Sequence, residues 1–112
     1  MQRLILATTL LVCAGCIRAT EKPLTVPSDS RANYTILKVG GKFPSRTIVT
    51  KRVGSSGTSY SKRLYNCSNQ TVKYLGSGDT LSAMASSKPD PKMAEIVSGS
   101  IADYVGRQAC KR

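Results

Sequence analysis

Stretches rich in β-branched and aromatic residues alternate with short polar breaks through the middle of the chain, and this pattern predicts four strands. The strand segments are residues 33–39, 46–53, 58–67 and 71–75. The pair Gly40–Gly41 is expected to end the first strand, and Gly76 and Gly78 to close the fourth. The Gly-Ser-Ser-Gly run at 54–57 is a turn signal, so residues 46–67 should form a β-hairpin.

The pattern between residues 79 and 97 is less regular. Residues 81–85 fit a helical turn, and the proline-containing residues 87–92 fit a loop. Residues 93–97 again combine apolar and β-branched side chains and fit a short fifth strand. The sheet is therefore expected to contain between four and six strands.

The last segment has helical periodicity. Ser100 is a favourable N-cap, and Asp103 stands three residues later, where its charge also suits the positive end of the helix dipole. At 100° per residue, one half of this helix carries only apolar side chains, which are Ile101, Ala102, Val105, Gly106, Ala109 and Cys110. Because most of them are small, the helix can lie close to a sheet.

The first 15 residues are typical of a bacterial lipoprotein signal peptide. Residues 4–14 are apolar and too short to span a bilayer, and an arginine precedes them. The small residues before Cys16 resemble a lipobox, although Cys13 stands where leucine is usual. Cys16 is therefore predicted to be the lipid-modified first residue of the mature chain. The alternative is an ordinary secretory leader that is cut shortly before Cys16.

The segment after the leader differs from the rest of the chain. Residues 16–32 contain two prolines, few apolar side chains and no period, so they are predicted to be a flexible tether. The folded part is expected to be a single domain from residue 33 to residue 112.

Cysteine parity predicts one disulfide. Removal of the leader takes away Cys13, and acylation would occupy Cys16, which leaves Cys67 and Cys110 to pair in an oxidising compartment. Such a bridge closes a loop of about 44 residues and stabilises the fold by roughly 4 kcal/mol in loop-closure entropy. The alternative is a cytosolic protein with two unrelated thiols.

These elements together predict an α+β fold. It consists of a small antiparallel sheet of four to six strands, with one C-terminal helix packed on it and pinned by the disulfide. A domain of this size with a single Phe and no Trp has a thin core, so the covalent link should contribute much of its stability.

The two cysteine contexts resemble a known family. Residues 64–75 place a cysteine at the end of a strand before a polar break, and residues 98–110 place a serine-capped helix before the second cysteine. Together they resemble the surface-adhesin protein E family of small bacterial outer-membrane lipoproteins. The resemblance covers about residues 47–110 and implies an antiparallel sheet, a C-terminal helix and a disulfide between them. It assigns no binding residue to this chain.

The charge distribution indicates an anionic partner. The chain has 17 Lys and Arg against 6 Asp and Glu, and no acidic residue occurs from residue 30 to residue 78. The cations predicted to bind an anionic partner are Arg46, Lys51, Arg52, Lys62, Arg63 and Lys73. A solvated surface that only aids solubility is the alternative.

Few residues of the chain are suited to catalysis or metal binding. The chain has no histidine, its two domain cysteines are assigned to the disulfide, and its acids form no obvious pair. A Ser-x-x-Lys match at residues 59–62 falls in a predicted strand without the companion motifs of penicillin-binding proteins. We therefore expect no enzyme activity, no cofactor and no metal site.

Tyrosines are interleaved with cations in the third and fourth strands. Tyr60, Tyr65 and Tyr74 lie among these basic residues, a combination that can bind single-stranded nucleic acid. The alternative is that one or two of these rings cover the core beneath the helix. An envelope lipoprotein seldom meets nucleic acid, so we do not expect it as a partner.

The sequence leaves three functions open, all of them non-catalytic. The first is an outer-membrane-anchored lipoprotein that binds a protein or an anionic envelope partner through its basic sheet, as an adhesin does. The second is a small lipoprotein subunit of a type IV secretion or conjugation complex, which would dock through the proline-containing segment after Cys16. The third is a cationic periplasmic inhibitory protein. A homodimer is left open as well.

Overall fold

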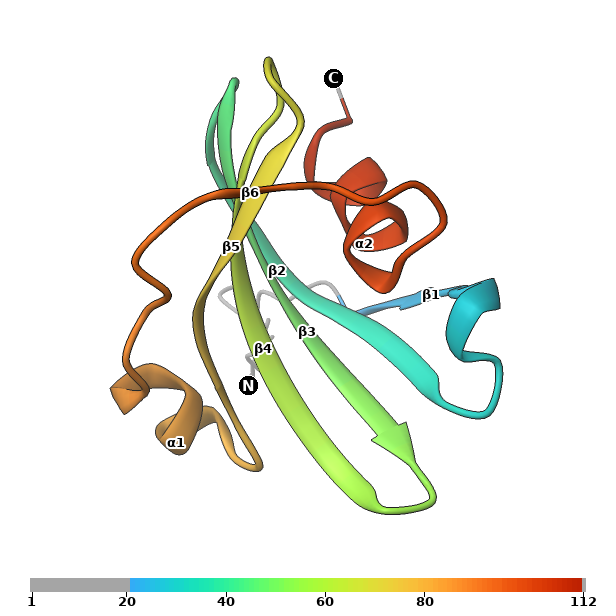
Figure 1. Ribbon diagram of the computed structural model, residues 1–112. Helices are drawn as coiled ribbons and strands as arrows, with labels where there is room; N and C mark the ends of the chain where they lie inside the picture. Colours follow the sequence, from blue (N-terminus) through green and yellow to red (C-terminus); the bar gives the residue numbers. More distant parts are fainter. Residues whose placement is uncertain (1–20, 112) are drawn as a thin grey trace, which may run out of the picture.

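The computed structural model describes residues 21–111, which form one curved antiparallel sheet with a helix on each face (Figure 1). The C-terminal helix α2 lies on the concave side of the sheet, and the shorter helix α1 lies on the convex side. The predicted α+β fold is confirmed.

The sheet is a meander in which each strand pairs with its neighbours in sequence. Its strands are β1 (Lys22–Leu24), β2 (Asn33–Lys42), β3 (Ser45–Gly54), β4 (Gly57–Asn66), β5 (Thr71–Gly78) and β6 (Ala94–Glu95). The predicted hairpin is formed by β3 and β4, which are joined through a two-residue loop between Gly54 and Gly57. The predicted fifth strand is reduced to the two residues of β6 at the sheet edge.

Two β-bulges contribute to the curvature of the sheet. The register between β2 and β3 skips Leu37, and the register between β4 and β5 skips Leu75. An extra residue on one strand bends it and increases its twist. Of the glycines expected to end strands, Gly40, Gly41 and Gly76 lie inside them, whereas Gly78 is the last residue of β5 as predicted. Gly41 pairs with Arg46 in the ladder and has a φ of 85°, a conformation that favours glycine.

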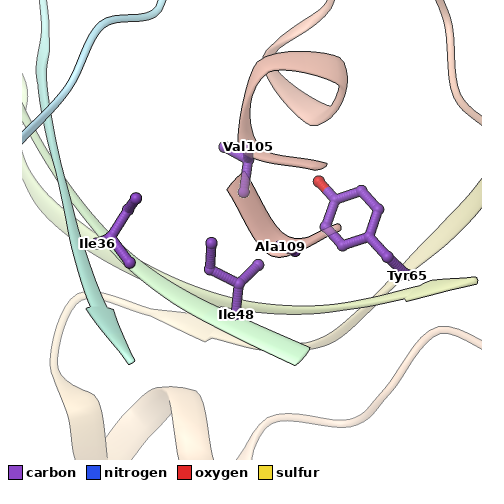
Figure 2. Close-up of a cluster of buried hydrophobic side chains, with 5 residues drawn as sticks. All are labelled: Ile36, Ile48, Tyr65, Val105 and Ala109. Atoms are coloured by element: carbon purple, nitrogen blue, oxygen red, sulfur yellow. The ribbon is translucent and has the colours of Figure 1, made fainter. Parts of the chain in front are cut away.

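Helix α2 (Ile101–Ala109) covers the core on the concave face. Ile36, Ile48 and Tyr65 point from the sheet toward Val105 and Ala109 of the helix (Figure 2). All of these side chains are buried, and the remaining residues of the predicted apolar half of the helix are buried or half-buried. The N-cap is confirmed, since the Ser100 hydroxyl accepts a hydrogen bond from the Asp103 amide at 3.1 Å.

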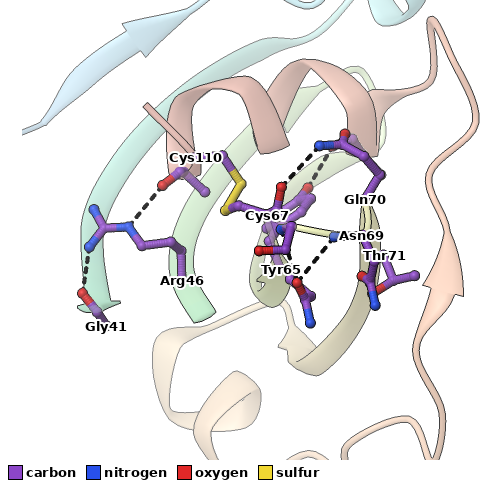
Figure 3. Close-up of a disulfide and its surroundings, with 12 residues drawn as sticks. Gly41, Arg46, Tyr65, Cys67, Asn69, Gln70, Thr71 and Cys110 are labelled. Atoms are coloured by element: carbon purple, nitrogen blue, oxygen red, sulfur yellow. Dashed lines mark hydrogen bonds between the residues drawn. A yellow bond between two sulfur atoms is a disulfide. The ribbon is translucent and has the colours of Figure 1, made fainter. Parts of the chain in front are cut away.

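A disulfide and an arginine hold the C-terminal end of α2 (Figure 3). Cys67, which follows β4, is bonded to Cys110 with a Cα–Cα distance of 5.7 Å, so the predicted disulfide is confirmed. On the other side, Arg46 Nε donates to the Ala109 carbonyl at 2.9 Å, and the same guanidinium contacts the Gly41 carbonyl. Arg46 thereby satisfies a carbonyl that the end of the helix leaves unpaired.

Helix α1 (Leu81–Ser86) packs on the convex face against β5. A Cβ at Gly76 would overlap the carbonyl oxygen of Met84, and a Cβ at Gly78 would lie 2.7 Å from that of Ala83. The two glycines therefore allow the helix backbone to approach the strand closely, and Gly78 is also the residue at which the strand ends.

The prediction of a flexible tether over residues 16–32 is wrong for its second half. Residues 22–24 form β1, which pairs with β2, and Pro27–Asp29 form a 3-10 helix, η1. Val26 is buried, and the Asp29 carboxylate binds Arg52 on β3. One apolar side chain and one ion pair thus fix a segment whose composition alone indicates a loop.

Candidate functional site

The six cations predicted as one anion-binding surface lie on both faces of the sheet. Side chains alternate between faces along a strand, so the register assigns each of them. On β3, Arg46 and Arg52 share the concave face with Ile48, whereas Lys51 lies on the convex face. The complete assignment puts three arginines on the concave face and three lysines on the convex face, namely Arg46, Arg52 and Arg63 against Lys51, Lys62 and Lys73.

The three arginines make specific contacts within the protein. Arg46 binds the end of α2, and Arg52 is paired with Asp29. Arg63 is 4% exposed and donates to the Thr50 hydroxyl and to the Tyr74 hydroxyl. The prediction of a single basic face is therefore wrong, because spacing along the chain did not reveal which cations the fold uses.

Asp29 is the centre of a polar cluster at the edge of the concave face. Its carboxylate accepts hydrogen bonds from Arg52 Nε at 2.7 Å, from Arg52 Nη2 at 3.2 Å and from the Tyr34 hydroxyl at 2.7 Å. The bond from Arg52, with a smaller effect from Tyr34, lowers the pKa of Asp29 below its ordinary value. Burial, together with the bond to Asp29, raises the pKa of Tyr34 to about 12. At neutral pH the carboxylate is thus charged and the phenol is protonated.

The convex face carries a group of lysines that we call the lysine face, consisting of Lys38, Lys51, Lys62 and Lys73. Lys38 and Lys62 lie opposite Val49 on its two sides, and Lys73 lies opposite Leu64. All four side chains are exposed or half-exposed, and none of them forms an ion pair with another residue in the range 21–111. Their positive charge is therefore available to a partner.

A groove of about 600 Å³ adjoins the lysine face. Leu37, Val49, Leu81 and Met84 provide its apolar wall, and Lys38 and Lys62 also line it. The sequence alone carries no signal for this groove, because the groove depends on the packing of α1 against β5, which the glycines of β5 permit.

The three tyrosines do not form a common platform for stacking. Tyr65 is fully buried beneath α2, where its hydroxyl donates to the Ala102 carbonyl at 2.6 Å. Tyr74 lies on the concave face next to Arg63, whose guanidinium carbon is 4.8 Å from the ring centre. Tyr60 lies opposite Lys51 on the convex face. Tyr65 therefore covers the core beneath the helix, which agrees with the alternative to nucleic-acid stacking given for these tyrosines.

The predicted lipidation site, Cys16, lies outside the described residues. Within the range 21–111 no helix is long and apolar enough to cross a membrane. In the same range no three His, Cys, Asp or Glu side chains gather as metal ligands would.

Comparison with known proteins identifies no relative of this chain. No protein-family model matches it, and neither a curated protein nor a solved structure matches it. A function for this chain can therefore be inferred only from the charges and contacts of its described residues.

Proposed function

We propose that this protein is a non-catalytic bacterial cell-envelope lipoprotein whose lysine face binds an anionic, phosphate-bearing envelope surface. The observation that carries the proposal is the gathering of Lys38, Lys51, Lys62 and Lys73 on one side of a sheet whose strands β2–β5 contain no acidic residue. Unpaired cations on a broad face attract head-group phosphates over several ångströms.

The length of chain between the proposed lipid and the sheet supports this partner. Only four residues, 17–20, separate Cys16 from Glu21, where the described structure begins. Even fully extended, the five residue-to-residue steps from Cys16 to Glu21 span at most about 18 Å. A lipid on Cys16 would therefore hold the domain beside the membrane that carries it, within reach of its phosphates.

The packing of the segment after Cys16 weakens the alternative role as a subunit of a secretion channel. That role requires the proline-containing segment after Cys16 to be free for docking, but Val26 is buried and Asp29 is paired with Arg52. Deletion of residues 24–31 would remove part of the fold as well as a docking segment, so it cannot separate the two functions. Substitution of the lysines tests the proposal without this ambiguity.

The test is sedimentation of the full-length Cys16→Ser chain with vesicles, so that no lipid anchor contributes to binding. Vesicles of phosphatidylglycerol and phosphatidylethanolamine are compared with vesicles of phosphatidylcholine. Each lysine near an anionic surface contributes about 1 kcal/mol, so the variant Lys51→Gln/Lys62→Gln/Lys73→Gln should bind the anionic vesicles roughly a hundredfold more weakly. Binding should also fall with added salt.

The matched control removes three cations elsewhere, in the variant Lys22→Gln/Arg31→Gln/Lys111→Gln. These residues are exposed and lie outside the lysine face, so this variant should keep most of the binding. Equal losses in the two triple variants would show that net charge alone acts, and would overturn the proposal.

Lipidation is tested separately in cells. The wild-type chain should incorporate radioactive palmitate and fractionate with the outer membrane, and Cys16→Ala should lose the label. Incorporation of the label by the Cys16→Ala variant would contradict the assignment of Cys16.

A further inference from the structure

Arg63 is a buried cation without an acidic partner among the described residues. Its residue exposure is 4%, and its Nε forms no hydrogen bond. Its two terminal nitrogens donate to neutral groups, Nη1 to the Thr50 hydroxyl at 3.1 Å and Nη2 to the Tyr74 hydroxyl at 3.0 Å. Buried charges are normally paired, because removing an ion from water costs several kcal/mol.

Arg63 lines a polar pocket of about 380 Å³ on the concave face. Hydroxyl groups of Thr50, Ser59, Ser61 and Tyr74 also line it. These groups can donate hydrogen bonds to an oxyanion, and a guanidinium presents a planar fork that suits carboxylate and phosphate oxygens.

The charges around this pocket add up in favour of an anion. Its lining contains Arg52, Arg63 and Asp29, which leave one net positive charge. Asp29 is bound by Arg52 and Tyr34, so it does not neutralise Arg63. Ile101, the first residue of α2, also lines the pocket, so the positive end of the helix dipole lies beside it, and Asp103 in the first turn offsets part of that positive field.

We propose that this pocket binds the oxyanion group, phosphate or carboxylate, of a small ligand, with Arg63 as the central cation and the surrounding hydroxyls as additional donors. The site is independent of the lysine face, since it lies on the opposite side of the sheet. Its occupation would provide the counter-charge that the described residues do not give Arg63.

The test follows the side-chain Nε–H resonance of Arg63 by nuclear magnetic resonance in the purified, disulfide-bonded, ¹⁵N-labelled protein. Sodium phosphate and sodium acetate are titrated separately, with sodium chloride at matched ionic strength as the reference. We expect a saturable shift of this resonance and of the backbone amides of residues 50, 59 and 61 with at least one oxyanion. Saturation by phosphate alone assigns a phosphate ligand, and saturation by acetate alone assigns a carboxylate.

A pair of variants separates binding from a merely structural role. Arg63→Met removes the cation from the pocket, whereas Lys111→Met removes an exposed cation beyond the opposite end of α2, outside both the pocket and the lysine face. The oxyanion that binds should raise the thermal midpoint of the wild type and of Lys111→Met relative to chloride, by mass action, and should not raise that of Arg63→Met. If Arg63→Met does not fold, the resonance titrations of the wild type and of Lys111→Met still test the proposal.

Two results would overturn the proposal. One is that neither phosphate nor acetate gives a saturable shift of the Arg63 resonance beyond that of chloride. The other is that Lys111→Met loses the response as well, which would indicate general screening of charge. Because vesicles are absent from this experiment, its failure would leave the proposed role of the lysine face untouched.

Discussion

At the scale of single residues, the contact between Gly106 and Tyr65 shows how the helix reaches the sheet. A Cβ at position 106 would come within 2.6 Å of Cε1 of the Tyr65 ring, and that ring is fully buried. The ring also holds the helix through the bond from its hydroxyl to Ala102. The Tyr65 ring therefore has little freedom to move away from a side chain at position 106.

Gly106→Ala should destabilise the protein, although alanine is the better helix former. Overpacking of a buried contact costs about 1–3 kcal/mol, which exceeds the gain in helix propensity of about 1 kcal/mol. We expect the thermal midpoint to fall by about 5 °C or more. Gln108→Ala, in the same helix, should shift it little. A thermal midpoint for Gly106→Ala above that of the wild type would show that the Tyr65 ring can move to make room for the added methyl group.

The roles of single arginines were the least predictable part of the candidate site. By sequence, Arg46, Arg52 and Arg63 group with the lysines, because all are basic and close in the chain. Which face each one occupies depends on the strand register, and two bulges alter that register. The partners of Arg46 and Arg52, Ala109 and Asp29, are 63 and 23 residues away, so local sequence carries no signal for them.

At the scale of elements, the segment from β1 to η1 is the part of the fold that was missed. Prolines and polar residues are common in tethers, and a three-residue strand has no period to detect. By contrast, the α2 helix was predicted to within a residue, because its cap and its apolar half are both local features. The disulfide was predictable because parity left only one pair.

The anchoring of η1 should make stability depend on pH. The pKa of Asp29 is lowered in the folded state, so its stabilisation is complete above the ordinary value of 3.8 and is lost as the pH falls through the folded value. Asp29→Asn should lower the thermal midpoint at pH 6 and reduce its decline between pH 5 and pH 2. Asp103, whose pKa is also lowered by the Gly99 amide and Arg107, should account for part of the decline that remains.

Identical pH profiles for Asp29→Asn and the wild type would contradict the anchoring. Arg31→Gln serves as the control, since Arg31 is exposed and close in sequence to η1. It should change neither the midpoint at pH 6 nor the acid profile.

Reduction of the disulfide should release the end of α2 and lower stability by roughly 4 kcal/mol, from the loop-closure entropy of the unfolded chain. Cys67 and Cys110 are 43 residues apart in sequence, so reduction allows the unfolded chain many more conformations. Hydrogen exchange of residues 101–110 should accelerate with reductant more than that of β3. The double variant Cys67→Ser/Cys110→Ser should match the reduced protein and show no response to reductant. Alkylation of both cysteines in the unfolded, unreduced wild type would contradict the bridge.

At the scale of the whole molecule, the sheet places the basic residues on two opposite faces, which the total charge of the chain does not reveal. The total of 17 basic residues does not say where the proposed anionic partner would bind. The fold buries one arginine, engages two in structural contacts and leaves the lysine face open on the opposite side. Fold class followed from local patterns, whereas the layout of the site follows from the curvature of the sheet and the seating of two helices.

If Cys16 carries a lipid, the early start of the fold would also limit how far the domain could move from a membrane. The 17 residue-to-residue steps from Cys16 to Asn33 could span at most about 60 Å, but the five steps from Cys16 to Glu21 can span at most about 18 Å. If Cys16 carries the lipid, a flexible 20-residue Gly-Ser insertion after Thr20 should lower the effective concentration of the lysine face at the surface roughly tenfold. On anionic vesicles, Lys51, Lys62 and Lys73 should then react faster with a water-soluble acylating reagent, while the thermal midpoint stays unchanged. Equal reaction rates with and without the insertion would show that the short tether does not hold this face at the membrane.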